Sequence, residues 1–167
     1  PWQRGSALFC IGVARQQAGD EAGALEAFRP AVAALAEAKA RPPQGHIELA
    51  VARLWFADLL SKRGQHKEAR KALEESVAEL RPLAGAPGPR TTDRGWLGIT
   101  YFALSDVCRH LKDTGAADRA AREAGQYAVA GFFGGGGPGG GPWRPGGPFG
   151  GGPFGKKDGP PGKGGKN

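Results

Sequence analysis

The sequence predicts an all-α fold of about six helices, arranged as three stacked helical hairpins and followed by a glycine- and proline-rich tail. Three observations carry this prediction. Apolar residues in the first 130 positions recur with the 3.6-residue period of a helix, and no segment shows the alternation of β-branched residues that is typical of a strand. A glycine followed five residues later by an alanine recurs three times, at Gly19 and Ala24, Gly64 and Ala69, and Gly115 and Ala120.

The chain divides into a helical domain, residues 1–130, and a low-complexity tail, residues 131–167. The sequence has 167 residues with 30 Gly and 14 Pro, and 25 of these Gly and Pro residues lie in the last 37 positions. Both residue types disfavour helix interiors, and the tail holds few large apolar side chains to offset its ordering entropy. We therefore expect no packed fold after residue 130.

Each of the first two hairpins is expected to join its helices through a short polar turn centred on a glycine. The turns lie at Gly19 and Gly64, and each is followed by a segment whose apolar residues keep the helical period. The four helices of these hairpins are expected at Ser6–Gln17, 22 to about 40, His46–Lys62 and 67 to about 80.

The third hairpin is expected to pair a helix over Asp93–Lys112 with a helix from Ala116 to about Ala130. Its turn is predicted at Gly115, by analogy with the other two glycines. The connections between hairpins, residues 41–45 and 84–90, are rich in the helix breakers Pro and Gly. They separate the three hairpins along the chain.

The first hairpin resembles the tetratricopeptide repeat (TPR). The matching residues are Leu8, Ile11, Gly12, Gly19, Ala24, Phe28 and Ala31. The repeat glycines are 45 and 51 residues apart, against about 34 in the standard repeat, so the chain is more similar to the long-period variants of the family. The resemblance implies a right-handed helical-hairpin solenoid in which the first helix of each hairpin lines a concave, protein-binding groove.

The TPR frame implies that nine residues of the first helices face this groove. They are Phe9, Val13 and Gln16 in the first hairpin, Leu54, Asp58 and Ser61 in the second, and Ser105, Arg109 and Lys112 in the third. The Lys/Asn clamp by which some family members grip a carboxylate is not reproduced, because Leu54 and Asp58 stand at its expected positions. The alternative for Phe9, Val13 and Leu54 is that they belong to the hydrophobic core.

The tail carries five aromatic residues in its Gly/Pro background: Phe132, Phe133, Trp143, Phe149 and Phe154. The sequence Gly-Gly-Pro-Phe-Gly at 146–150 repeats directly at 151–155. Aromatic side chains at intervals on an extended backbone fit a row of apolar pockets, so we expect the tail to dock on its own helices or on a neighbouring copy. The last hairpin is expected to leave an apolar face for it to cover.

The sequence indicates no enzyme, no cofactor and no metal site. Because His46 and His66 lie 20 residues apart in the second hairpin and His110 lies in the third, a shared metal site is not expected. Ser105, Asp106 and His110 are not expected to form a catalytic triad, since Ser105 and Asp106 project about 100° apart on one helix. The tail glycines lack the Lys-Ser/Thr that a phosphate-binding loop requires.

The net charge of +7 does not indicate a basic face, because the helical domain contributes +3 and the tail +4. Cys10 and Cys108 are expected to be buried apolar residues and not a disulfide framework. No apolar run approaches the roughly 20 residues that span a membrane. The chain starts at Pro1 and contains no Met, so its compartment stays open: extracellular or at the cell surface if a signal peptide was removed before Pro1, or cytoplasmic.

These features predict a non-enzymatic protein–protein interaction scaffold. Our first hypothesis is a self-assembling structural subunit, for example of a filament, whose aromatic arm docks on a neighbouring copy. The alternative is a monomeric TPR adaptor that binds a partner's peptide in its concave groove. The third hypothesis, RNA or single-stranded nucleic acid binding by the basic tail, is weaker because Arg144 is the tail's one arginine and no Arg-Gly-Gly repeat occurs.

Overall fold

The computed structural model describes residues 2–38, 42–85 and 91–127, and within these ranges it contains six helices and no strand. The all-α prediction is therefore confirmed for this part of the chain. Residues 131–167, predicted as a separate tail, lie outside the described residues. The helices are α1 (Trp2–Gln17), α2 (Glu21–Glu37), α3 (Pro43–Lys62), α4 (His66–Ala84), α5 (Thr91–His110) and α6 (Thr114–Gln126).

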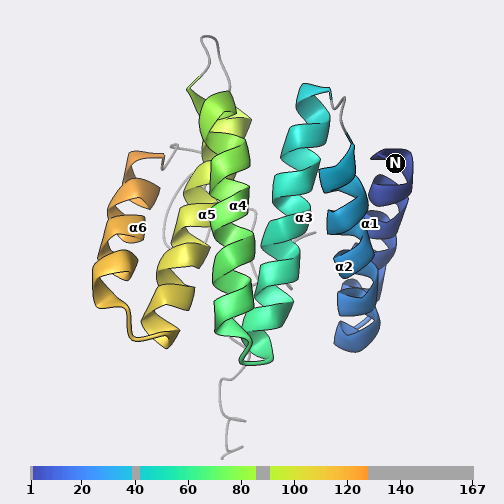
Figure 1. Cartoon of the computed structure of the whole chain (residues 1–167), viewed down its shortest axis with the longest axis horizontal. Coiled ribbons are helices and arrows are strands. Elements are labelled where there is room, and N and C mark those ends of the chain that lie inside the picture. The colour runs from blue at the N-terminus through green and yellow to red at the C-terminus, as the bar shows by residue number, and fades with distance from the viewer. Residues whose placement is uncertain (1, 39–41, 86–90, 128–167) are drawn as a thin grey trace, which may run out of the picture.

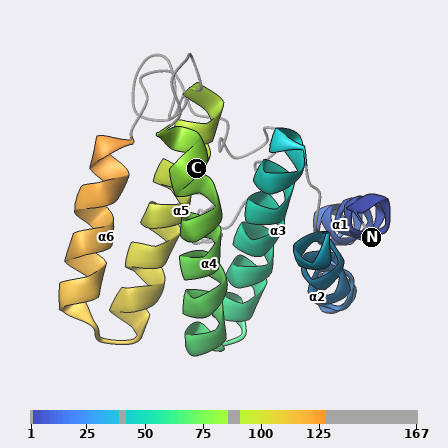
Figure 2. The same ribbon diagram turned by 45° about the horizontal axis from the view of Figure 1, so that its top comes forward.

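The six helices lie side by side in chain order, from α1 at one end of the row to α6 at the other (Figure 1), and the order is equally clear in a tilted view (Figure 2). The most extensive packing is within α1–α2, α3–α4 and α5–α6, which form three helical hairpins. Neighbouring hairpins meet where α2 packs on α3 and α4 packs on α5. In addition α3 approaches both α1 and α5, whereas the backbones of α2, α4 and α6 stay farther apart. The first helices therefore share one side of the row.

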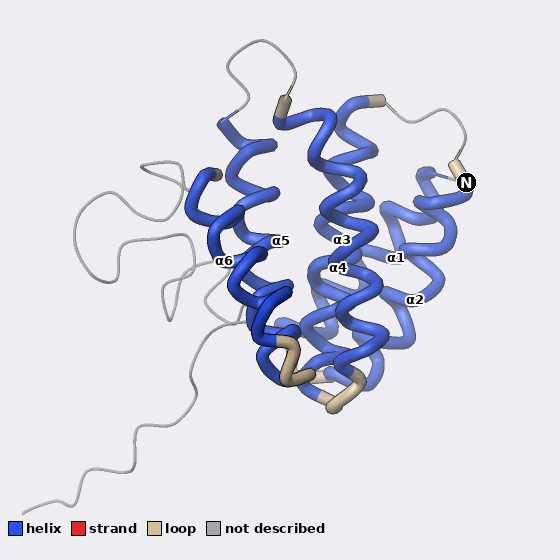
Figure 3. The backbone as a smooth tube through the Cα atoms, turned by 60° about the vertical axis from the view of Figure 1, so that its left-hand side comes forward, coloured by secondary structure: helices blue, strands red, loops and turns tan. Residues whose placement is uncertain are grey.

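The turns of the first two hairpins lie at the predicted glycines, and the described chain is otherwise helical apart from short connections (Figure 3). Gly19 has φ +81° and Gly64 has φ +76°, a left-handed conformation that costs an L side chain energy but not glycine. Asp20 then caps α2, because its carboxylate accepts a 2.8 Å hydrogen bond from the backbone N–H of Gly23.

The third turn differs from the prediction. Gly115 lies inside α6, and the left-handed residue of this turn is Lys112, with φ 60°. The helix begins at Thr114, two residues earlier than expected, because Asp113 caps it: the Asp113 carboxylate accepts a 3.0 Å hydrogen bond from the N–H of Ala116. This bond, together with the Arg70 guanidinium, holds the pKa of Asp113 below its ordinary value. The predicted repeat frame is therefore three residues out of register in the third hairpin.

The corrected register puts small residues at equivalent, tightly packed positions. Five residues after each turn residue stands a buried alanine: Ala24, Ala69 and Ala117, at most 1% exposed. Seven residues before each turn residue, on the first helix of the hairpin, stand Gly12, Ala57 and Ser105. A Cβ on Gly12 would lie 2.5 Å from the Phe28 ring, and the Ser105 hydroxyl donates a 2.9 Å hydrogen bond to the carbonyl of Ala117. Both helices of a hairpin thus need short side chains where they cross.

The two ends of the row also differ from expectation. The last helix buries Ala116, Ala117, Ala120 and Ala124, while Asp118, Arg119 and Arg122 on its other face are exposed. The last hairpin therefore presents a polar outer face instead of the expected apolar one. It is α1 that exposes a stripe of small and apolar residues, at Ala7, Cys10, Ile11 and Ala14.

The two cysteines occupy different environments. Cys108 is 1% exposed, as predicted, and burial raises the pKa of its thiol. Cys10 is exposed on the outer face of α1, so the prediction that it is buried was wrong. Apolar residues occupy two faces of α1, and only the face of Phe9 and Val13 packs against the core.

Candidate functional site

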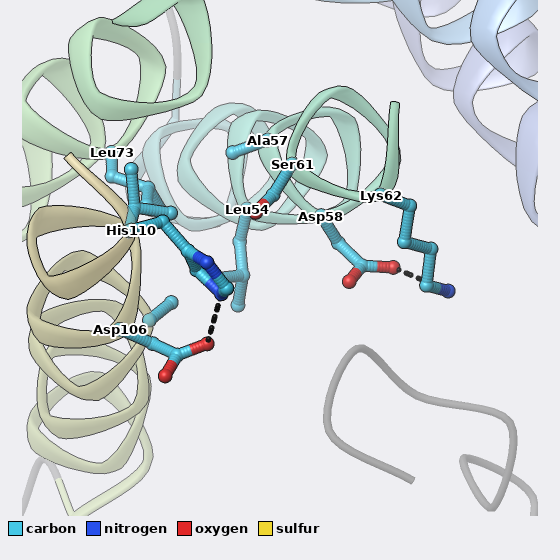
Figure 4. Close-up of a pocket in the computed structure, with 10 residues that line it drawn as sticks. Leu54, Ala57, Asp58, Ser61, Lys62, Leu73, Asp106 and His110 are labelled. Atoms are coloured by element: carbon cyan, nitrogen blue, oxygen red, sulfur yellow. Dashed lines mark ion pairs between the residues drawn. The ribbon is translucent and has the colours of Figure 1, made fainter. Parts of the chain in front are cut away.

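A pocket of about 190 Å³ lies between α3 and α5, the first helices of the second and third hairpins (Figure 4). Its apolar wall combines residues of three helices, all at most 6% exposed. Five polar side chains surround this wall, and one of them is the carboxylate of Asp58. The apolar residues are Leu54, Ala57, Leu73, Ala103 and Val107, and the other polar ones are Ser61, Lys62, Asp106 and His110.

Asp58 is the most unusual member of the pocket, since its side chain is only 5% exposed. Lys62, one helical turn later, lies 3.0 Å from its carboxylate. The amide of Gln16 on α1 donates a long, 3.5 Å hydrogen bond to the same oxygen. Burial raises the pKa of Asp58, and Lys62 opposes this shift without cancelling it. The fold therefore holds a carboxylate in the pocket at some cost to stability when it is ionised.

Two histidines meet beside the pocket, although they belong to different hairpins. The rings of His66 and His110 are stacked, with centroids 4.7 Å apart and planes 2° from parallel. The His66 Nδ1 is 3.3 Å from the Ser61 hydroxyl, and the His110 Nε2 is 3.8 Å from Asp106 (Figure 4). No group of three or more His, Cys, Asp or Glu side chains among the described residues is placed to hold a metal ion.

The structure brings together the three groove residues predicted in the second hairpin, because Leu54, Asp58 and Ser61 all line the pocket. Leu54 is also part of the core, at 1% exposure, so this residue both lines the pocket and belongs to the hydrophobic core. In the first hairpin Phe9 and Val13 are partly buried against the core. Gln16, one turn further along α1, reaches the pocket through Asp58.

The groove residues predicted in the third hairpin are three positions out of register, because the turn lies at Lys112 and not at Gly115. Ser105 is 1% exposed and hydrogen-bonded inside its own hairpin, so it does not face a groove. Lys112 lies in the turn, and Arg109 is exposed with its guanidinium 3.9 Å from Asp106. The corrected frame assigns the groove positions of α5 to Phe102, Asp106 and Arg109.

The sequence reasoning missed Asp106 and His110 as pocket residues, and it missed Phe102, which is 49% exposed, as a position of the predicted groove face. The signal that could have found them is Asp113, a capping residue equivalent to Asp20, which sets the register of the third turn. The predicted docking residues of the tail, Phe132, Phe133, Trp143, Phe149 and Phe154, lie outside the described residues.

Replacing Asp58 by asparagine tests the cost of its ionised form. A carboxyl whose pKa is raised on folding binds its proton more tightly in the folded state, so ionisation lowers stability as the pH rises through the folded-state pKa. We expect Asp58→Asn to be neutral or stabilising at about pH 7, by up to about 1 kcal/mol, and this advantage to shrink on acidification. Urea unfolding across pH measures it, with the exposed Asp118→Asn as control. A larger loss at neutral than at acid pH would contradict the prediction.

Comparison with models of known protein families, with curated proteins and with solved structures finds no match to this chain. The class to which it is assigned is therefore the one that its fold defines, an all-helical protein of three consecutive hairpins over the described residues. None of the helices in that part of the chain is both long and apolar enough to cross a membrane.

Proposed function

We propose that this chain is a protein-binding module, in which the three hairpins form a right-handed, TPR-like solenoid. Its binding face is built from α1, α3 and α5, and it receives an extended segment of a partner protein. The pocket between α3 and α5 accepts one side chain of that segment. This proposal develops the adaptor hypothesis, because the residues that support it are those of the groove.

The observation that carries the proposal is the buried carboxylate of Asp58 against the apolar wall of the pocket. Core positions of a hairpin are filled most stably by apolar residues, and a buried ionisable group costs stability unless it is fully paired. Asp58 has one cation, Lys62, and one long hydrogen bond. Perturbed ionisable groups in a concave site are typical of functional positions, and this carboxylate can accept further hydrogen bonds from a ligand.

The size and chemistry of the pocket favour a peptide side chain over a free metabolite. Its volume of about 190 Å³ is below the roughly 300–1,000 Å³ of small-molecule sites. Its wall is apolar, and two carboxylates stand beside it: Asp58, paired with Lys62, and Asp106, which lies 3.9 Å from the Arg109 guanidinium and is half-exposed. A segment that offers an apolar side chain next to a Lys or Arg is complementary to both features.

Selection of peptides from a random displayed library against the full chain tests this function. We expect the selected peptides to share an apolar residue beside a basic one. Asp106→Arg, at a half-exposed side chain, should weaken their binding about tenfold, which corresponds to about 1.4 kcal/mol. The matched control is Asp118→Arg on the outer face of α6, which should change nothing.

Binding that is equal in both variants, or a selection that yields no peptide sensitive to Asp106→Arg, would overturn the proposal. Self-assembly through the aromatic arm and nucleic-acid binding by the tail stay predictions from the sequence, because the residues concerned lie outside those that the structure describes.

A further inference from the structure

The described chain ends in contact with α5. Tyr127, which follows α6, packs so closely on this helix that a Cβ on Gly98 would lie 3.2 Å from the Tyr127 carbonyl oxygen. The Tyr127 ring stacks with Tyr101, with centroids 6.0 Å apart, and the Arg94 guanidinium lies 5.9 Å from its centroid. The chain that continues from residue 128 therefore leaves from the surface of α5 beside Gly98.

A row of residues on α5 leads from this point to the pocket. Gly98, Phe102, Asp106 and His110 are four residues apart, so neighbouring members of the row lie about 40° apart around the helix, and the row turns by about 120° from Gly98 to His110. Phe102 is 49% exposed, and Asp106 and His110 line the pocket. With a rise of about 1.5 Å per residue, Phe102 lies about 6 Å along the helix from Gly98 and His110 about 18 Å.

The chain after Tyr127 carries aromatic side chains at the matching distance. Ala128, Val129, Ala130 and Gly131 separate Tyr127 from Phe132 and Phe133. An extended chain spans about 3.3 Å per residue, so these two residues can lie about 17–20 Å from Tyr127. They are the first aromatic residues after Tyr127, and their reach covers the row as far as Asp106, which lines the pocket and lies about 12 Å along the helix from Gly98.

We propose that Phe132 and Phe133 dock on this row of the same chain, with one of their rings in the pocket between α3 and α5. The short spacer makes the contact intramolecular, with an effective concentration in the millimolar range, so a weak contact is enough to populate it. This inference rests on the proposed function in one respect, that the pocket is a binding site. It adds that the chain's own segment occupies the site and that a partner must displace it.

The three histidines of the full chain provide the test, since their ring-proton NMR signals report on nearby aromatic rings. The variant Phe132→Ala/Phe133→Ala should shift the signals of His110, which lines the pocket, and of His66, which stacks on it. His46, which bonds to Glu79, lies in the first turn of α3, at the other end of this helix from the pocket, and should not move. The matched control, Phe149→Ala/Phe154→Ala, removes the same two side chains farther along the tail and should leave all three histidines unchanged.

An unchanged His110 signal, or an equal change in the control variant, would overturn the inference. A His110 shift in the wild type that disappears on dilution, together with a dimer by light scattering, would also overturn it, because the occupant would then come from a second copy.

Peptide binding separates this inference from the proposed function. If the docked form is populated to about 90%, its removal should tighten the binding of a selected peptide about tenfold. Peptides that bind the wild type and Phe132→Ala/Phe133→Ala equally would contradict the tail contact while supporting the groove. A shifted His110 signal without any groove-dependent peptide would support the tail contact and contradict the proposed partner.

Discussion

Replacing Phe28 by alanine is expected to lower the free energy of unfolding by about 3–5 kcal/mol. Phe28 has no exposed surface and lies in the largest core cluster. Its ring packs on Phe9, with centroids 5.8 Å apart, and lies close to the backbone of α1 at Gly12. Because a helix backbone forms that wall, the wall cannot move in to close the hole left by the ring. The cavity cost therefore adds to the lost burial of the ring.

Urea unfolding followed by circular dichroism measures this loss. The control is Ile11→Ala on the outer face of α1, where 46% of the residue is exposed, and its cost should be about 0.5 kcal/mol or less. Similar losses for the two variants would show that α1 does not pack on Phe28 in the way that the fold requires.

The sequence predicts the hairpins well wherever local chemistry decides the structure. Gly19 and Gly64 mark their turns because only a left-handed residue closes them, and the alanines five residues later mark the helix crossings. In the third hairpin the capping residue, and not the glycine, decides where the turn lies. Asp113 caps α6, and Lys112 adopts the left-handed conformation without being a glycine. A frame built on glycine alone therefore sets the third hairpin three residues out of register.

The candidate site is less predictable, because it depends on packing between hairpins. Leu54, Asp58 and Ser61 could be placed from the frame of one hairpin. The stacking of His66 on His110 could not be placed in this way, since it depends on how α4 and α5 pack across the connection between the second and third hairpins. The burial of Asp58 is likewise a tertiary effect: nothing in the helical period of α3 shows that α1 and α5 enclose this carboxylate.

Arg53, which lies on α3 outside the pocket lining, links this helix to α4. Its guanidinium is 3.2 Å from Glu75 and 3.5 Å from Glu79, and its side chain is only 11% exposed. Glu79, 16% exposed, also bonds to His46. Arg53→Met should destabilise the protein by about 3 kcal/mol, because it removes a cation from beside two carboxylates, one of them largely buried. The matched control, Arg29→Met, breaks an exposed pair with Glu68 and should cost about 1 kcal/mol or less.

A second substitution distinguishes an uncompensated charge from lost packing. In the Arg53→Met background, Glu79→Gln removes the carboxylate that the first change left without its guanidinium, so it should restore part of the lost stability. The same Glu79→Gln change in the wild type should be destabilising, since Arg53 then loses an anion. Urea unfolding of the four proteins gives the coupling energy directly. Independent, additive effects would mean that Arg53 acts through the packing of its aliphatic stem and not through its charge.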